Sequence, residues 1–91
     1  MERVRVLVKG TVQGVGFRWS TRRIAATLGL GGWVRNTAEG NVEIEAMGDA
    51  DRIEDLLRWC AQGPEGARVS AVDVLERGPI PPRHPGSFAI L

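Results

Sequence analysis

Two hydrophobic periods alternate along this chain of 91 residues, and each period belongs to a different kind of secondary structure. From Val4 to Val8, valine occupies every second position, which predicts a strand with one buried face. From Phe17 to Leu28 the apolar residues recur at helical spacing, which predicts a helix that ends in the glycine-containing residues 29–31. A chain that uses both patterns buries one face of a sheet against helices.

The middle of the chain predicts a hairpin. Short strands are expected over Trp33–Arg35 and Val42–Ala46, where apolar and polar side chains alternate again. Residues 36–40 join the two strands, and Gly40 is available there for a positive φ angle. The hairpin therefore follows the first helix directly.

The second half repeats the order of helix and strand. Asp49 is a capping residue before a helix that ends at Gly63, with an apolar stripe of Ile53, Leu56, Leu57 and Cys60. Arg68–Arg77 predicts a strand, and a one-position slip in its apolar spacing predicts a bulge. Residues 78–86 hold four of the five prolines, which favours a surface loop, and Phe88 with Ile90 predicts a short last strand.

The element order β-α-β-β-α-β, followed by a short strand, is typical of an α+β protein with the ferredoxin-like α/β sandwich. We expect both helices to cover one face of an antiparallel sheet. Ninety-one residues lie far below the ~250 to 300 at which one core splits, so residues 1–91 are predicted to form a single domain. Such folds serve many functions, so the function must be argued from the site.

Composition excludes several classes of function. Twelve basic and eleven acidic residues give a net charge of +1, which argues against nucleic-acid and membrane partners. Cys60 cannot form an internal disulfide, and with His84 it provides too few ligands for a zinc site. The first residues contain no apolar run of a secretory signal, so we expect a cytoplasmic protein. Without heptads or a large apolar excess, we expect a monomer.

One edge of the predicted sheet gathers the polar candidates. Crossover rules place Gly10–Arg18, Asn36 and Gly63–Gly66 together, whereas the proline-rich loop lies at the opposite edge. Glycines before a helix N-terminus can turn backbone N–H groups toward an anion. Arg18 falls in the first helical turn, where a cation is unfavourable next to the helix dipole unless an anion is bound there. The loop is not a Walker A motif. At this point two structural alternatives to an anion site are open. In these, the glycines only form a tight turn with Arg18 in solvent, and Asn36 is only a hairpin residue that tolerates a left-handed φ angle.

Two stretches of sequence resemble a known family. Val12-Gln-Gly-Val-Gly-Phe-Arg18 and Gly32-Trp-Val-Arg-Asn36-x-x-x-Gly40-x-Val42-x-x-x-x-x-Gly48 are similar to both motifs of the acylphosphatases. The similarity continues through Gly63-Pro-x-Gly-Ala-Arg-Val69 to the last residues, so it covers nearly the whole chain.

The resemblance implies an enzyme that hydrolyses small-molecule acyl phosphates to a carboxylate and phosphate, with no metal and no cofactor. Arg18 matches the arginine that binds the phosphate, and Asn36 matches the asparagine that positions the attacking water. The backbone cradle for the phosphate corresponds to Gln13, Gly14, Val15, Gly16 and Phe17. By contrast, we predict that Cys60 is a core residue, that His84 has no catalytic role, and that Glu39 is solvated.

Two other classes of function fit the same fold. RNA-recognition domains share the element order, but they stack bases on strand aromatics that the first and third strands here do not offer. A non-catalytic phosphoryl-binding module, or a relative of the acylphosphatase-like domain of larger carbamoyltransferases, would keep the phosphate cradle. The presence of both Arg18 and Asn36 favours turnover over sensing.

Overall fold

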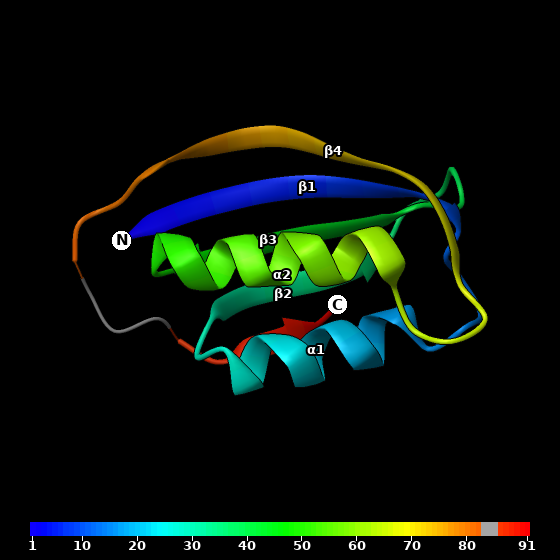
Figure 1. Cartoon of the computed structure of the whole chain (residues 1–91), viewed down its shortest axis with the longest axis horizontal. Coiled ribbons are helices and arrows are strands. Elements are labelled where there is room, and N and C mark those ends of the chain that lie inside the picture. Colours follow the sequence, from blue (N-terminus) through cyan, green and yellow to red (C-terminus); the bar gives the residue numbers. More distant parts are fainter. Residues whose placement is uncertain (83–85) are drawn as a thin grey trace.

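The computed structural model describes residues 1–82 and 86–91, in which two helices cover one face of a five-stranded sheet (Figure 1). This confirms the predicted ferredoxin-like α+β fold and its order of elements. The elements are β1 (Glu2–Thr11), α1 (Phe17–Thr27), β2 (Gly31–Asn36), β3 (Val42–Gly48), α2 (Ala50–Gln62), β4 (Arg68–Pro79) and β5 (Phe88–Ile90). None of these helices is long and apolar enough to cross a membrane.

The spatial order of the strands is β4-β1-β3-β2-β5. The first four strands pair antiparallel, but β5 pairs parallel with β2, from Gly32 opposite Phe88 to Val34 opposite Ile90. The prediction of an antiparallel sheet was therefore wrong at this edge. The strand β4 ends at the end of the sheet where β2 begins. A following strand that joins the sheet beside β2 from that end must therefore run in the same direction as β2, as β5 does.

The core lies between the sheet and the helices. The alternating valines of β1 (Val4, Val6 and Val8) are fully buried, as are Ile53 and Leu56 of α2. Cys60 is also fully buried, as predicted, and burial raises the pKa of its thiol to about 12. Asp49 is the N-cap residue of α2, but its carboxylate forms no capping hydrogen bond, so only its position was predicted correctly.

The predicted bulge is present in β4, where the register against β1 shifts twice. Arg5 lies opposite Glu76 and Val6 opposite Val74, which leaves Leu75 as the extra residue. The second shift is near Gly10, whose φ is 127° and where a Cβ atom would lie 2.1 Å from the carbonyl oxygen of Arg68. Gly10 therefore allows the close approach of two backbones where β1 turns toward the following loop.

The sheet face without helices carries a network of ion pairs between neighbouring strands. Glu43 accepts bonds from Arg5 at 2.9 Å and from Arg35 at 2.7 Å, and its exposed fraction is 5%. Lys9 pairs with Asp73 at 2.8 Å in the same way. The basic residues of β1 are therefore neutralised by acidic residues of the neighbouring strands, and the free basic residues relevant to an anionic ligand lie elsewhere.

Candidate active site

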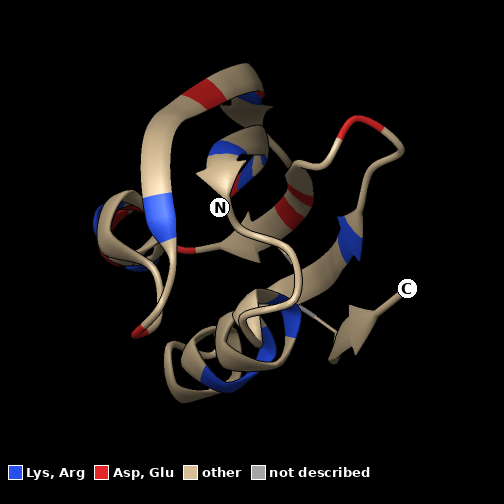
Figure 2. Cartoon of the chain, turned by 90° about the vertical axis from the view of Figure 1, so that its right-hand side faces the viewer, with Lys and Arg blue, Asp and Glu red and all other residues tan. Residues whose placement is uncertain are grey.

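Three loops meet at the end of the sheet that lies at the right of Figure 1 and faces the viewer in Figure 2. They connect β1 to α1, β2 to β3, and α2 to β4. This grouping was predicted. At the opposite end, the amide of Ile80 donates to the carbonyl of Met1 at 3.0 Å, which places the start of the proline-rich segment there. His84, predicted to be non-catalytic, lies outside the described residues.

The loop between β1 and α1 has the backbone of an anion-binding turn. Gly14 and Gly16 both have a φ of 75°, whereas Val15 between them has a negative φ. Alternation of the sign of φ turns successive N–H groups toward one side, which is the basis of anion-binding nests. No side chain caps α1 at Gly16, so the helix start is open to a ligand.

The first turn of α1 adds further N–H donors and a cation. The amide of Ser20 donates to the carbonyl of Gly16 at 3.0 Å, so the amides of Phe17 to Trp19 precede the helical hydrogen-bond ladder. Arg18 is exposed, the first turn contains no acidic residue, and no ion pair is formed by Arg18 within residues 1–82 and 86–91. Figure 2 shows basic but no acidic residues on α1. The arginine is therefore available to an anionic ligand.

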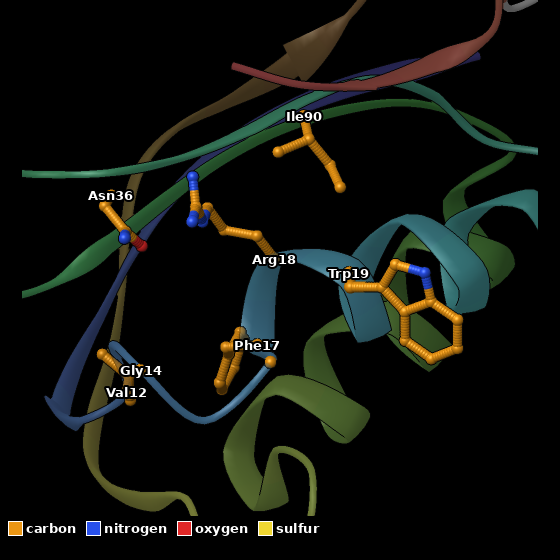
Figure 3. Close-up of a pocket in the computed structure, with 8 residues that line it drawn as sticks. Val12, Gly14, Phe17, Arg18, Trp19, Asn36 and Ile90 are labelled. Carbon is orange, nitrogen blue, oxygen red and sulfur yellow. The ribbon is translucent and has the colours of Figure 1, made fainter.

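Arg18 and Asn36 line the same cavity. Asn36 is the last residue of β2 and lies opposite Val42 of β3, so the sheet fixes its position. The cavity has a volume of about 200 Å³, and Figure 3 shows the guanidinium of Arg18 extending toward Asn36. Pockets for drug-sized ligands measure ~300 to 1,000 Å³, so this one suits a small group such as a phosphoryl group. The cavity is lined by Val12, Gly14, Gly16, Phe17, Arg18, Trp19, Asn36 and Ile90.

Two of the predicted cradle residues direct their side chains away from this cavity. The Nε2 of Gln13 donates to the carbonyl oxygens of Thr37 at 2.8 Å and Asn41 at 2.9 Å. Val15 packs against the hydrophobic core. Gln13 thus ties the loop before α1 to the hairpin loop that follows Asn36, and it holds together the two segments that carry the candidate catalytic residues.

Phe17 anchors the start of α1. Its side chain is 2% exposed, and its ring centroid lies 5.2 Å from that of Trp59 in α2. At Gly63, a Cβ atom would lie 2.8 Å from the Phe17 ring, so the end of α2 can pass the ring only because it has no side chain there. The packing of Phe17 therefore fixes the position of the helix N-terminus, while its backbone amide remains at the cavity.

Two features of the site were not predicted from sequence: the hydrogen bonds of the Gln13 side chain and the place of Ile90 at the cavity. Both depend on contacts between segments that are distant in the chain, of the loop before α1 with the hairpin loop and of β5 with β2. Glu39, predicted to be solvated, is exposed on the hairpin loop. Within the described ranges 1–82 and 86–91, no group of three or more His, Cys, Asp or Glu side chains is arranged to hold a metal ion.

Known proteins share both the sequence and the fold of this chain. A family model described as acylphosphatase matches residues 4–90. An acylphosphatase of Methylococcus capsulatus is 55% identical over 76 residues, which cover 84% of this chain and 83% of that protein. The crystal structure of acylphosphatase from Bacillus subtilis superposes with a TM-score of 0.91 at 32% identity, covering 100% of this chain and 99% of the other. An acylphosphatase structure from Coxiella burnetii gives a TM-score of 0.84 at 40% identity, covering 99% and 93%. The chain therefore belongs to the acylphosphatase family of hydrolases.

Proposed function

We propose that this protein hydrolyses the carboxyl-phosphate bond of small-molecule acyl phosphates by direct attack of water on phosphorus. The observation that carries the proposal is the shared cavity of Arg18 and Asn36, which opens onto the glycine loop and the start of α1. Membership of the acylphosphatase family supports the same reaction.

In this proposal the phosphoryl group is held by charge and by backbone donors. Arg18 binds two of its oxygens with the planar fork of the guanidinium, and the amides of residues 13–17 bind the others. Each charge-assisted hydrogen bond contributes about 1.5 to 3 kcal/mol before ordering costs. The positive φ angles of Gly14 and Gly16 support a loop whose amides face the cavity before a substrate binds, and such donors would stabilise the charge that spreads over the phosphoryl oxygens in the transition state.

Asn36 positions the water. Its carboxamide can accept one hydrogen bond and donate others, but it is not a base at neutral pH. The oxygen of the water forms a bond to phosphorus while the bond from phosphorus to the acyl oxygen breaks, and the carboxylate leaves with that electron pair. A phosphate oxygen of the substrate takes the proton of the water. A carboxylate is a good leaving group, so the site needs orientation rather than a strong general acid.

The scheme uses no metal ion, cofactor or nucleic-acid partner. We further propose that the protein acts as a monomer in the cytoplasm, where the single Cys60 remains reduced in the core.

The test is hydrolysis of acetyl phosphate in the presence of a chelator by the wild type and by Arg18→Ala and Asn36→Ala variants. Arg22→Ala is the matched control, because Arg22 is an exposed arginine one turn further along the same helix. We expect Arg18→Ala to raise KM and lower kcat, and Asn36→Ala to lower kcat while competitive inhibition by inorganic phosphate remains. Full turnover by Asn36→Ala would exclude water positioning by Asn36. Phosphate binding without any turnover in the wild type would identify a phosphoryl sensor instead.

A further inference from the structure

The end of β2, which carries Asn36, has a strand partner on one side only. β5 pairs with β2 only as far as Val34, whose carbonyl also accepts a bond from the amide of Leu91 at 2.9 Å. Among the described strands, only β3 pairs with Arg35 and Asn36. Asn36 also lines a second cavity of about 400 Å³, in addition to the one that it shares with Arg18. The position of Asn36 therefore depends on what holds the last residues of β2 against β3.

A buried carboxylate joins the residue before Asn36 to the centre of the sheet. Glu43 lies opposite Arg35 of β2, and on its other side it lies opposite Leu7 of β1. Its Oε1 accepts a hydrogen bond from Nε of Arg35 at 2.7 Å, and its Oε2 accepts one from Nη1 of Arg5 at 2.9 Å. Only 5% of Glu43 is exposed, so water competes little with these charge-assisted bonds. We call the two hydrogen bonds the Glu43 bridge.

The Glu43 bridge is part of a row of contacts that crosses four strands in their spatial order, β4-β1-β3-β2. On the β4 side, Arg5 also pairs with Glu76 at 3.3 Å. On the β2 side, the guanidinium of Arg35 lies 5.8 Å from the ring centroid of Trp33. Both arginines of the bridge are therefore held by a second neighbour. Loss of the Glu43 carboxylate would break this row at the end of β2.

We propose that Glu43 is a positioning residue, which holds Arg35 and thereby keeps Asn36 in place for the attacking water. This inference rests on the proposed function, because it adds a residue that supports the role assigned to Asn36. Successive side chains of a strand point to opposite faces, so Arg35 lies on the face without helices while Asn36 lies at the active-site cavity. A displacement of one therefore displaces the other. Glu43 does not line the cavity of Arg18, so phosphate binding should not depend on the bridge.

The test measures kcat and KM for acetyl phosphate, and the inhibition constant of inorganic phosphate, in the wild type, Glu43→Gln, Arg35→Gln and Glu45→Gln at a temperature where each is folded. A small displacement of a group that orients a reactant costs a large factor in rate, so we expect Glu43→Gln and Arg35→Gln to lower kcat by about tenfold. The inhibition constant of phosphate should not change. Glu45→Gln is the matched control, because Glu45 lies two positions further from Asn36 along β3 and accepts a bond from Trp33 at 2.8 Å. It should keep the wild-type kcat.

A double variant tests whether Glu43 acts through Asn36. If it does, Glu43→Gln should change the residual kcat of Asn36→Ala by less than about twofold, because the bridge then has no water-binding side chain to position. A further tenfold loss in that background would overturn the proposal.

The outcomes separate this inference from the proposed function. If the wild type hydrolyses acetyl phosphate but Glu43→Gln and Arg35→Gln keep its kcat, the positioning role is wrong and the proposed function stands. An equal loss of kcat in Glu45→Gln, or a loss of phosphate inhibition in Glu43→Gln, also overturns it, because either shows a general effect on the sheet or the phosphate site. Should Glu43→Gln fail to fold, Arg35→Gln decides alone, since the side chain of Arg35 is 52% exposed. If the folded wild type does not hydrolyse acetyl phosphate, the proposed function fails and this inference fails with it.

Discussion

Replacement of the Gln13 side chain tests whether its hydrogen bonds hold the loop before α1 against the hairpin loop that follows Asn36. We call this pair of hydrogen bonds the Gln13 clamp. The amide of Gln13 donates both of its hydrogens to carbonyl oxygens of the hairpin loop, at 2.8 Å to Thr37 and 2.9 Å to Asn41. A neutral hydrogen bond contributes about 0.5 to 1.5 kcal/mol net. Because Gln13 is only partly buried, water can replace part of this in the variant. We therefore expect Gln13→Ala to reduce the free energy of unfolding by about 1 to 2 kcal/mol.

Urea unfolding and thermal unfolding measure this loss. For a domain of this size, 1 kcal/mol lowers the melting temperature by about 4 to 8 °C. Gln13→Glu should cost more than Gln13→Ala, because a carboxylate of the same shape has no N–H to donate and faces two carbonyl oxygens. Gln62→Ala is the control for loss of a glutamine side chain, since Gln62 is exposed at the end of α2, and it should unfold like the wild type.

Kinetics separate positioning from stability alone. If the clamp positions Asn36, Gln13→Ala should lower kcat by about tenfold or more at temperatures where the variant is fully folded. Inhibition by inorganic phosphate should persist, because the backbone amide of residue 13 and the side chain of Arg18 are still present. A variant that loses stability but keeps the wild-type kcat would show that the clamp only holds the loop. Wild-type stability together with wild-type kcat would refute the reasoning altogether.

Close backbone contact, charge and burial each give one further prediction. Gly32→Ala should cost about 4 kcal/mol or more in urea unfolding, since a Cβ atom would lie 1.9 Å from the carbonyl oxygen of Glu45. Burial raises the pKa of Glu43, but bonds from Arg35 and Arg5 outweigh it and leave the pKa below its ordinary value. The ion pairs of Glu43 stabilise the folded state at neutral pH, and this stabilisation is lost as the pH falls below about 4. On acidification, the urea midpoint of Glu43→Gln should therefore fall less than that of the wild type. Cys60 should react with a thiol reagent at pH 8 only at the rate of unfolding, and rapid reaction in the folded state would contradict its burial.

Most of the fold could be predicted because each element carries its own local signal. The valines of β1 and the apolar stripe of α2 have the periods of a strand and a helix, and the slip in β4 indicated its bulge. The direction of β5 has no such local signal, because three residues in a strand look the same whether their pairing is parallel or antiparallel. The start of β2 was also predicted too late, at Trp33, because Gly31 was interpreted together with Gly29 as a residue that ends a helix.

The two glycines that begin β2, Gly31 and Gly32, show why a glycine in a strand can be misread as a turn residue. At Gly31 a Cβ atom would lie 2.8 Å from the backbone of Gly86, and at Gly32 it would lie 1.9 Å from the backbone of Glu45. Both positions need glycine for close approach of another segment inside the sheet. That requirement comes from a partner distant in sequence, so the sequence pattern alone cannot distinguish it from a helix stop.

The candidate site shows the same division between local and distant causes. The placement of Arg18 in a first helical turn and of Asn36 at a strand end follows from the element order, and the structure brings both to one cavity. The hydrogen bonds of the Gln13 side chain and the place of Ile90 at the cavity could be seen only from the neighbours of each residue in the fold. In both cases a hydrogen-bonding or apolar side chain looked unremarkable in its own segment.

The parallel strand β5 brings the last residues of the chain to the candidate active site. The loop before α1 and the end of β2 both belong to the first half of the chain, and they already provide Arg18 and Asn36. The strand β5 adds Ile90 to this site because β2 is the outer neighbour of β3 and leaves its other edge free for pairing. The cavity is therefore lined by residues from both ends of the chain.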